Sequence, residues 1–207
     1  MPTLFSYCIR YDGGAAPNPF WGVCTLVICK PRIRSVAKVG DWIVGTGSVN
    51  SPIGDIGGQA VYIMQVSKKM TMEAYNAFVK THLPNKIPKW FSKDVRRRLG
   101  DAVYDFSVDP PSLRRSVHNE SHRERDLGGK YALLSEHFFY FGDQPRQLPD
   151  HLLPIVKQGS GHRSRANDPY VEVFLDWLNS LDLKSNRVYS KPQCRLFKDD
   201  FVGIGST

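Results

Sequence analysis

Short apolar stretches separated by turn-forming residues fill the first 66 residues, and this rhythm constrains the fold more than any other feature of the sequence. Each stretch has the length and the β-branched or aromatic content of a strand. Between them lie loops rich in Gly, Pro, Asn and Asp at residues 11–19 and 47–54, and a basic connection at residues 30–34. Ligand contacts usually lie in such loops. The pattern predicts strands at Leu4–Arg10, Gly22–Cys29, Trp42–Thr46 and Ala60–Val66.

Two helices are predicted further along the chain. Thr71 is a suitable N-cap and Glu73 lies in the first turn, so a helix is expected from Thr71 to about Lys80. A second helix is expected to open with Asp168 at the N-cap and Pro169 at the first helical position. Apolar residues then recur with helical spacing on one face, at Val171, Phe174, Leu175 and Leu178.

The segments between these helices differ in character. Residues 80–130 hold 12 Lys and Arg against 7 Asp and Glu, and they form a basic, loop-rich middle. Residues 131–142 are strongly aromatic and have strand character. We expect two strands there, broken near Ser135 and Glu136.

The chain has 207 residues, which is enough to bury one substantial core. We expect a single domain over residues 1–183 and a C-terminal tail over residues 184–207. The expected fold is α+β, built round a strongly bent, barrel-like sheet of mixed or antiparallel strands. The helices near residues 71–80 and 168–181 should pack outside this sheet.

The net charge of +8 and the isoelectric point near 9.4 favour a polyanionic partner. No apolar run approaches the roughly 18 residues that span a bilayer, and the first residues lack the features of a secretion signal. We therefore expect a cytoplasmic protein without membrane contact. The four cysteines lack the two-residue spacing of zinc and redox motifs, so we expect reduced thiols at Cys8, Cys24, Cys29 and Cys194.

Standard cofactor and metal motifs are missing from the sequence. The segment from Gly45 to Asn50 has two glycines spaced as in a dinucleotide fingerprint but lacks the third, and no phosphate-binding P-loop motif occurs. The zinc deaminase pattern is also absent. We therefore expect no cofactor and no metal. The same loop still offers backbone amides together with the Ser48 hydroxyl and the Asn50 amide for a base edge or a phosphate.

Two polar segments are candidates for chemistry and for phosphate binding. His118 and Glu120 lie close together in sequence and are of the residue types used in general acid–base catalysis. Glycines and basic residues share the loop at residues 157–167, which suits a phosphate grip because glycines let the backbone approach and guanidiniums bind phosphate oxygens in pairs. The phosphate candidates are His162, Arg163 and Arg165.

Aromatic residues supply the other half of a nucleotide-binding hypothesis. A base taken out of its stack is held between aromatic faces and identified at its edge by hydrogen bonds. Trp21 follows the loop that contains Asn18, and Trp42 opens a predicted strand. Either ring could line a base-binding pocket, although a Trp in a strand most often belongs to the core.

Several blocks of the sequence resemble the nucleotide modification associated domain 2 family. They are residues 5–22 (FSYCIRYDGGAAPNPFWG), 40–48 (GDWIVGTGS), 116–120 (SVHNE) and 158–162 (QGSGH), and the resemblance covers most of residues 4–180. The family occurs in bacteria and phages and is linked to DNA base modification mainly by genomic association. The resemblance therefore implies a context of DNA modification and leaves the reaction open.

A more distant resemblance concerns PUA-like barrels, which include the EVE and ASCH groups. It depends on residues 40–44 (GDWIV), a return strand at 61–66 (VYIMQV) and the start of a helix at 72–75 (MEAY). Those barrels hold a base of RNA or a modified base of DNA in a pocket. The long basic middle of this chain departs from a minimal barrel.

The leading hypothesis is a module that binds DNA or a nucleotide and recognises a modified base. Trp21 and Trp42 would stack on the base, and His162, Arg163 and Arg165 would hold phosphates. The alternative is an enzyme that makes or edits a modified base, with His118, Glu120 and either Asp12 or Asp55 as acid–base residues. A docking subunit of a DNA-modification enzyme is the third hypothesis. In the leading hypothesis the residues that recognise base edges are Asn18, Ser48, Asn50 and His118.

Overall fold

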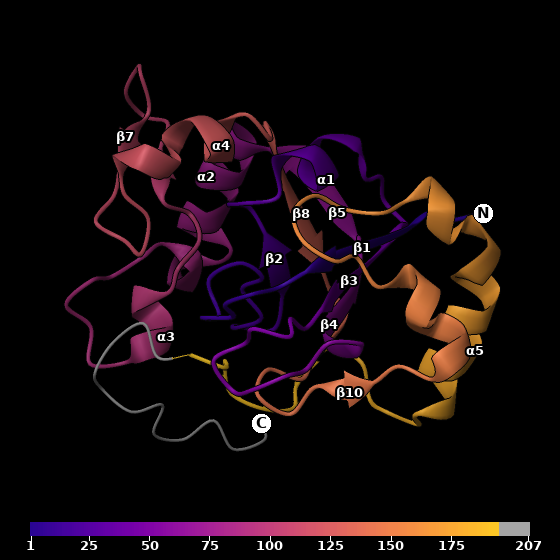
Figure 1. The fold of residues 1–207 in the computed structure, drawn as a ribbon. Coiled ribbons are helices and arrows are strands. Elements are labelled where there is room, and N and C mark those ends of the chain that lie inside the picture. Colours follow the sequence, from indigo (N-terminus) through magenta and orange to yellow (C-terminus); the bar gives the residue numbers. More distant parts are fainter. Residues whose placement is uncertain (195–207) are drawn as a thin grey trace.

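The computed structural model describes residues 1–194, and these form an α+β fold (Figure 1). The largest sheet has the strand order β1-β3-β4-β9-β11, with β10 added beside β4. Its pairs β1/β3 and β9/β11 are parallel, and β3/β4, β4/β9 and β4/β10 are antiparallel. The strands are β1 (Leu4–Cys8), β3 (Trp42–Thr46), β4 (Gln59–Gln65), β9 (His137–Tyr140), β10 (Arg146–Gln147) and β11 (Arg187–Val188).

A second sheet of three antiparallel strands has the order β2-β8-β5. A two-stranded ribbon joins β6 to β7. These strands are β2 (Cys24–Leu26), β5 (Lys68–Thr71), β6 (Tyr104–Asp105), β7 (Ser112–Leu113) and β8 (Tyr131–Ser135).

Five α-helices and four 3₁₀ helices occur within the described residues. The α-helices are α1 (Pro31–Val36), α2 (Met72–Thr81), α3 (Val95–Arg98), α4 (Arg123–Leu127) and α5 (Val171–Ser180). The 3₁₀ helices are η1 (Pro84–Lys86), η2 (Glu120–His122), η3 (Asp150–Ile155) and η4 (Arg165–Tyr170).

The alternation of side chains along the strands explains how these elements form layers. On β9, Phe138 faces the second sheet and α1, whereas Phe139 faces α5 and η3. The same alternation holds on β4, where Met64 and Ile63 point to opposite faces of the large sheet. The far face of the second sheet is covered by α2 and α3. In Figure 1, α5 therefore lies on one side of the molecule and α2, α3 and α4 on the other.

Two stretches of chain pass from one sheet to the other. β4 leads through two residues into β5, and β8 continues past Glu136 into β9. The α+β class and the mixed sheet are therefore confirmed. Across residues 1–194 the strands form separate sheets and no closed barrel, so the barrel-like, PUA-like form is not confirmed.

The predicted strands are present: the first two are shorter than predicted, Trp42–Thr46 agrees at both ends, and the fourth is shifted by one residue to Gln59–Gln65. The predicted break near Glu136 is present. The helix after Thr71 is confirmed, since the Thr71 hydroxyl accepts a hydrogen bond from the amide of Ala74 at 3.1 Å. The strand β5, which precedes this helix, was not predicted.

Two local predictions are wrong. Asp168 is not the N-cap of the last helix, because Asp168 and Pro169 lie inside η4 and α5 begins at Val171. The apolar face of α5 is as predicted, with Val171, Phe174 and Leu178 buried. The basic connection at residues 30–34 contains helix α1, which forms because Pro31 suits the first helical position and Ile33 is buried against the core.

Part of the segment expected as a C-terminal tail is attached to the fold. β11 pairs with β9, and the Cys194 amide donates to the carbonyl of Asp12 at 3.0 Å. The remainder of the predicted tail, residues 195–207, lies outside the described residues. Among residues 1–194 no helix has the length and apolar character needed to cross a membrane.

Candidate active site

Cys29 lies at a sharp turn between a strand and a helix. β2 ends at Leu26 and α1 begins at Pro31. Within this turn Cys29 has φ 58° and Lys30 has φ 40°, both in the left-handed region that non-glycine residues rarely adopt. Such a conformation costs about 1–3 kcal/mol and is concentrated at functional sites. A strained strand-to-helix turn is also how hydrolases of several kinds expose a nucleophile.

The Cys29 thiol has an imidazole and a carboxylate behind it. Cys29 Sγ lies 3.8 Å from His118 Nε2, and His118 Nδ1 donates to Asp126 Oδ2 at 2.5 Å. Asp126 is fully buried, and its Oδ1 also accepts the backbone amide of Cys29 at 2.8 Å. A nucleophile, a base and a group that orients the base are thus in contact, which is the arrangement used in covalent catalysis by thiols.

The electrostatics of these three side chains favour a charged imidazole. Burial by itself lowers the pKa of His118, but the hydrogen bonds with Asp126 and Cys29 outweigh it and raise the pKa to about 9. Burial raises the pKa of Asp126, and the hydrogen bonds from His118 and the Cys29 amide more than offset this, so the pKa is lowered. His118 is therefore protonated at neutral pH, and its positive charge lies beside the Cys29 sulfur, with Nε2 3.8 Å from Sγ.

A buried arginine holds the backbone on both sides of the site. Arg34 donates from Nε to the carbonyl of Cys29 at 2.7 Å and from Nη2 to the carbonyl of Asp126 at 2.5 Å. Gly129 makes room for this guanidinium, because a Cβ there would lie 2.3 Å from Arg34 Cζ. Burial lowers the pKa of Arg34 to about 10, which leaves it charged at neutral pH. Arg34 is a positioning residue that joins the turn at Cys29 to α4.

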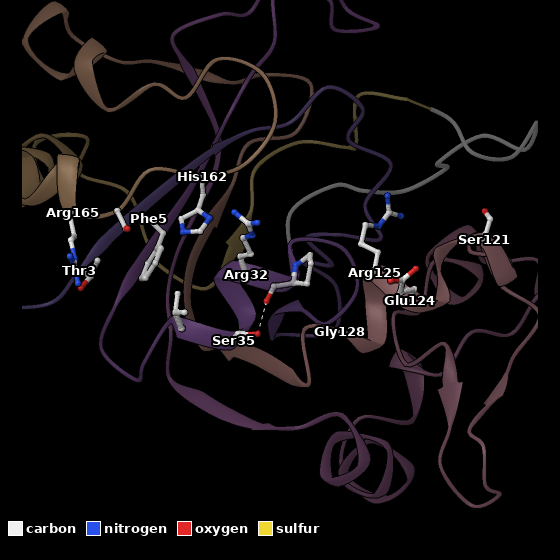
Figure 2. Close-up of a pocket in the computed structure, with 13 residues that line it drawn as sticks. Thr3, Phe5, Arg32, Ser35, Ser121, Glu124, Arg125, Gly128, His162 and Arg165 are labelled. Carbon is white, nitrogen blue, oxygen red and sulfur yellow. Dashed lines mark hydrogen bonds between the residues drawn. The ribbon is translucent and has the colours of Figure 1, made fainter.

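Two clefts meet at the first turn of α1. The thiol cleft, of about 470 Å³, is lined by Tyr7, Ile9, Tyr11, Cys29, Ile33 and Ser160 among others. The basic cleft, of about 890 Å³, is lined by Thr3, Phe5, Ser35, Ser121, Glu124 and Arg165 among others (Figure 2). Both clefts share Pro31, Arg32, Arg125 and His162, so they are contiguous.

Positive charge gathers around the shared residues. Arg32 and Arg125 extend from α1 and α4 toward the same side, and His162 lies across from α1 (Figure 2). Burial lowers the pKa of His162, and the charges of Arg32 and Lys30 lower it further. The contiguous clefts therefore suit an anionic ligand, and the half-buried thiol of Cys29 opens into one of them.

The structure brings together three of the residues predicted for function. His118 is at the thiol centre, and His162 and Arg165 line the basic cleft. Arg163 lies in the same loop, but its Nε points to Asn167 Oδ1 at 3.4 Å. Glu120 is exposed and forms an ion pair with Arg123 Nε at 2.5 Å. The carboxylate that contacts His118 is therefore Asp126 and not the predicted Glu120.

The other predicted base contacts lie elsewhere. Ser48 accepts from the Asn50 amide at 3.1 Å in an exposed turn, beside a third cleft that Ser48 lines together with Asp55. Asp12 is buried and accepts from Tyr140 Oη at 2.6 Å, and burial raises its pKa to about 6. Neither carboxylate adjoins the thiol.

The side chains of Asn18 and of the two tryptophans predicted to stack on a base contact other parts of the protein. Asn18 is buried and its Oδ1 accepts from the ammonium of Lys86 at 2.7 Å. Trp42 is buried under α5, with its ring centroid 6.4 Å from that of Phe174. Trp21 is half-buried below the guanidinium of Arg96, at 4.8 Å. None of the three lines the clefts described above.

Sequence reasoning missed Cys29 and Asp126. A usable signal existed for Cys29, since Pro31 at a first helical position directly after a predicted strand places the thiol at a strand-to-helix turn. Asp126 carried no comparable signal, because its partner Cys29 is 97 positions away. Within residues 1–194 no group of three His, Cys, Asp or Glu side chains is arranged to hold a metal ion.

The stability of the protein should depend on pH through His118. Its pKa is raised from 6.5 to about 9 on folding, so its contribution is fully present below pH 6.5 and is lost as the pH rises through 9. The shift corresponds to roughly 3 kcal/mol at 1.36 kcal/mol per unit. Urea unfolding below pH 6.5 and above pH 9 should show this loss in the wild type and a much smaller one in His118→Gln. Equal losses in both proteins would contradict the assignment.

A model of the protein family described as nucleotide modification associated domain 2 matches residues 1–199 of this chain. No curated protein and no solved structure matches the chain.

Proposed function

The chain belongs to the nucleotide modification associated domain 2 family, and from this premise we propose that it is a thiol-dependent enzyme of nucleotide modification. Cys29 would attack an electrophilic carbon of a nucleotide substrate. The observation that carries the proposal is the contact of Cys29 with His118 and of His118 with Asp126, beside a cleft with basic residues. Basic residues around a nucleophile suit a substrate that carries phosphate.

The reaction would use the three side chains in turn. The Cys29 thiolate, beside protonated His118, forms a bond from its sulfur to the substrate carbon. His118 then gives its proton to the group that leaves this carbon, which departs with the bonding electrons. Water, deprotonated by His118, adds to the same carbon and breaks the bond to sulfur, which regenerates the thiolate. Asp126 holds the imidazole ring in orientation throughout.

This proposal develops the enzyme hypothesis from the sequence and changes its residues. His118 keeps its acid–base role, Asp126 replaces Glu120 as its partner, and Cys29 becomes the nucleophile. The geometry favours this arrangement over the pair His118 and Glu120, because Glu120 is exposed and engaged by Arg123.

Labelling of cysteines with iodoacetamide at neutral pH tests the proposal. We expect Cys29 to be alkylated at least about 10-fold faster than Cys8, because the charged His118 stabilises its thiolate. Peptide mass spectrometry identifies the labelled residue. Cys8→Ser is the matched control, since Cys8 lines the same cleft but its Sγ donates to the carbonyl of Gly47, at 3.7 Å, and not to an imidazole.

The same variants should differ in catalysis. Normal and base-modified DNA and nucleotides are incubated with the protein, and nucleoside mass spectrometry detects a change in any base. We expect a conversion that Cys29→Ser abolishes and Cys8→Ser retains. Equal labelling of Cys8 and Cys29, or a conversion that persists in Cys29→Ser, would overturn the proposal.

A non-catalytic module that binds a nucleotide or a modified base is the second candidate. The presence of Arg32, Arg125, His162 and Arg165 at one contiguous pair of clefts favours it, because these side chains would bind phosphate without any need for the thiol. Under this hypothesis Cys29→Ser binds nucleotides like the wild type and no conversion is found with either protein. A docking role in a modification system would instead leave nucleotide binding undetectable in both.

A further inference from the structure

The two clefts form one track that is longer than the thiol site needs. They join at the first turn of α1, where Arg32 and Arg125 line both. The thiol cleft, at about 470 Å³, already falls within the usual range for a small ligand, roughly 300–1,000 Å³. A free nucleotide at Cys29 would leave the basic cleft, of about 890 Å³, without an occupant.

The basic side chains along this track have few acidic side chains near them to neutralise their charge. Arg32 is exposed and has no ion pair within the described part of the chain. Arg125 has only a distant one, with its Nε 3.9 Å from Asp126 Oδ1. Burial lowers the pKa of Lys30 and the charge of Arg125 lowers it further, so these cations repel one another. Glu124 is the acidic residue that lines the basic cleft.

An exposed aromatic ring lies at the thiol cleft. Tyr11 lines this cleft and is 62% exposed, which is unusual for so large a ring. The guanidinium of Arg10 lies 5.3 Å from its ring centroid. An exposed tyrosine beside basic residues is typical of surfaces on which single-stranded nucleic acids stack their bases.

Building on the proposed function, we propose that the substrate is a polynucleotide strand rather than a free nucleotide. One unstacked base enters the thiol cleft against Tyr11, and the flanking phosphates lie on Arg32 and Arg125. The adjoining nucleotides occupy the basic cleft toward His162 and Arg165. The base must leave its stack because the thiol is half-buried within a cleft and an enzyme cannot reach a base inside a duplex.

Fluorescence anisotropy with labelled oligo(dT) of about 12 nucleotides tests the track. We expect thymidine monophosphate to compete at least about 100-fold less well than the unlabelled oligonucleotide, because it makes only part of the contacts. Oligo(rU) of equal length is tested in parallel. The oligonucleotide that binds more tightly shows whether the substrate strand is DNA or RNA. Equal competition by the monophosphate would overturn the proposal.

Single substitutions test which residues contact the oligonucleotide. Each of Arg32→Ala and Arg125→Ala should weaken binding and reduce the slope of log affinity against log salt by about 0.7. Tyr11→Ala should weaken binding about 5-fold or more with little change of slope. Arg187→Ala is the matched control, since Arg187 is exposed on β11 at the opposite edge of the large sheet from β1. Unchanged affinity in the double variant of Arg32 and Arg125 would place the strand elsewhere.

Protection of Cys29 separates this proposal from the proposed function. Oligo(dT) should slow alkylation of Cys29 by iodoacetamide at concentrations where thymidine monophosphate does not. Fast alkylation of free Cys29 without such protection would refute the strand and leave the catalytic thiol intact. Slow alkylation of Cys29, with oligonucleotide affinity that still depends on Arg32 and Arg125, would refute the thiol enzyme and leave the strand site.

Discussion

His118→Gln is expected to lower the rate of any conversion that depends on Cys29 by about 10²- to 10⁴-fold, the usual contribution of a general acid–base residue. Glutamine is polar and of similar size, but it cannot give a proton to the leaving group or take one from the attacking water. Alkylation of Cys29 by iodoacetamide should slow by about 10-fold or more as well, because the cation beside Sγ is lost. Kinetics on the converted base and timed mass spectrometry measure the two effects.

The control for this variant is His122→Gln. The His122 ring stacks on that of His118 with a centroid distance of 4.4 Å, yet its Nδ1 accepts from the Asn119 amide and has no contact with Asp126. We expect rates within a few-fold of the wild type. A folded His118→Gln protein with wild-type rates would show that the imidazole is a structural neighbour of the thiol and not its base.

Asp101→Ala is expected to lower the free energy of unfolding by about 3–5 kcal/mol, the usual cost of removing one partner from a buried ionic network. Asp101 and Lys86 are both fully buried. Thr25 joins them, since its Oγ1 donates to Asp101 Oδ2 at 2.5 Å and accepts from Lys86 Nζ at 2.9 Å. Burial lowers the pKa of Lys86 to about 8, so at neutral pH a charged ammonium would lose its compensating carboxylate.

Chemical denaturation monitored by circular dichroism measures this loss. Asp176→Ala is the matched control, because Asp176 is an exposed carboxylate on α5, and its removal should change stability by less than about 0.5 kcal/mol. Combining Asp101→Ala with Lys86→Met should destabilise by less than the sum of the single changes, because the two charges belong to one network. A loss below about 1 kcal/mol in Asp101→Ala would contradict the ionic role of the network.

The network also explains why Asn18 was misleading as a candidate for base recognition. Its side chain amide has the groups that recognise a base edge, and it lies in a loop rich in glycine and proline. In the fold those groups are already used, since Oδ1 accepts from Lys86 and Nδ2 donates to the carbonyl of Leu99 at 2.9 Å. Residue type and loop context cannot distinguish a polar side chain that meets a ligand from one that satisfies a buried charge.

Trp42 shows the same limit for an apolar residue. The sequence predicts β3 as a strand, so Trp42 shares one face of it with Val44. Which face is covered depends on α5, whose Phe174 lies against the Trp42 ring. The sequence predicted that helix and its apolar side, but the choice of sheet face that the helix covers is a property of the packing.

The strand and turn rhythm of the first 66 residues, the helix after Thr71, the excess of positive charge and the resemblance to the family could all be predicted from the sequence. These depend on neighbours a few positions apart, through side-chain periodicity, capping and composition. The cluster of Cys29, His118 and Asp126 could not be predicted, because His118 and Asp126 reach Cys29 from 89 and 97 positions away. Sequence spacing carries no information about such contacts, since they form only where β2, α4 and the buried Arg34 pack together.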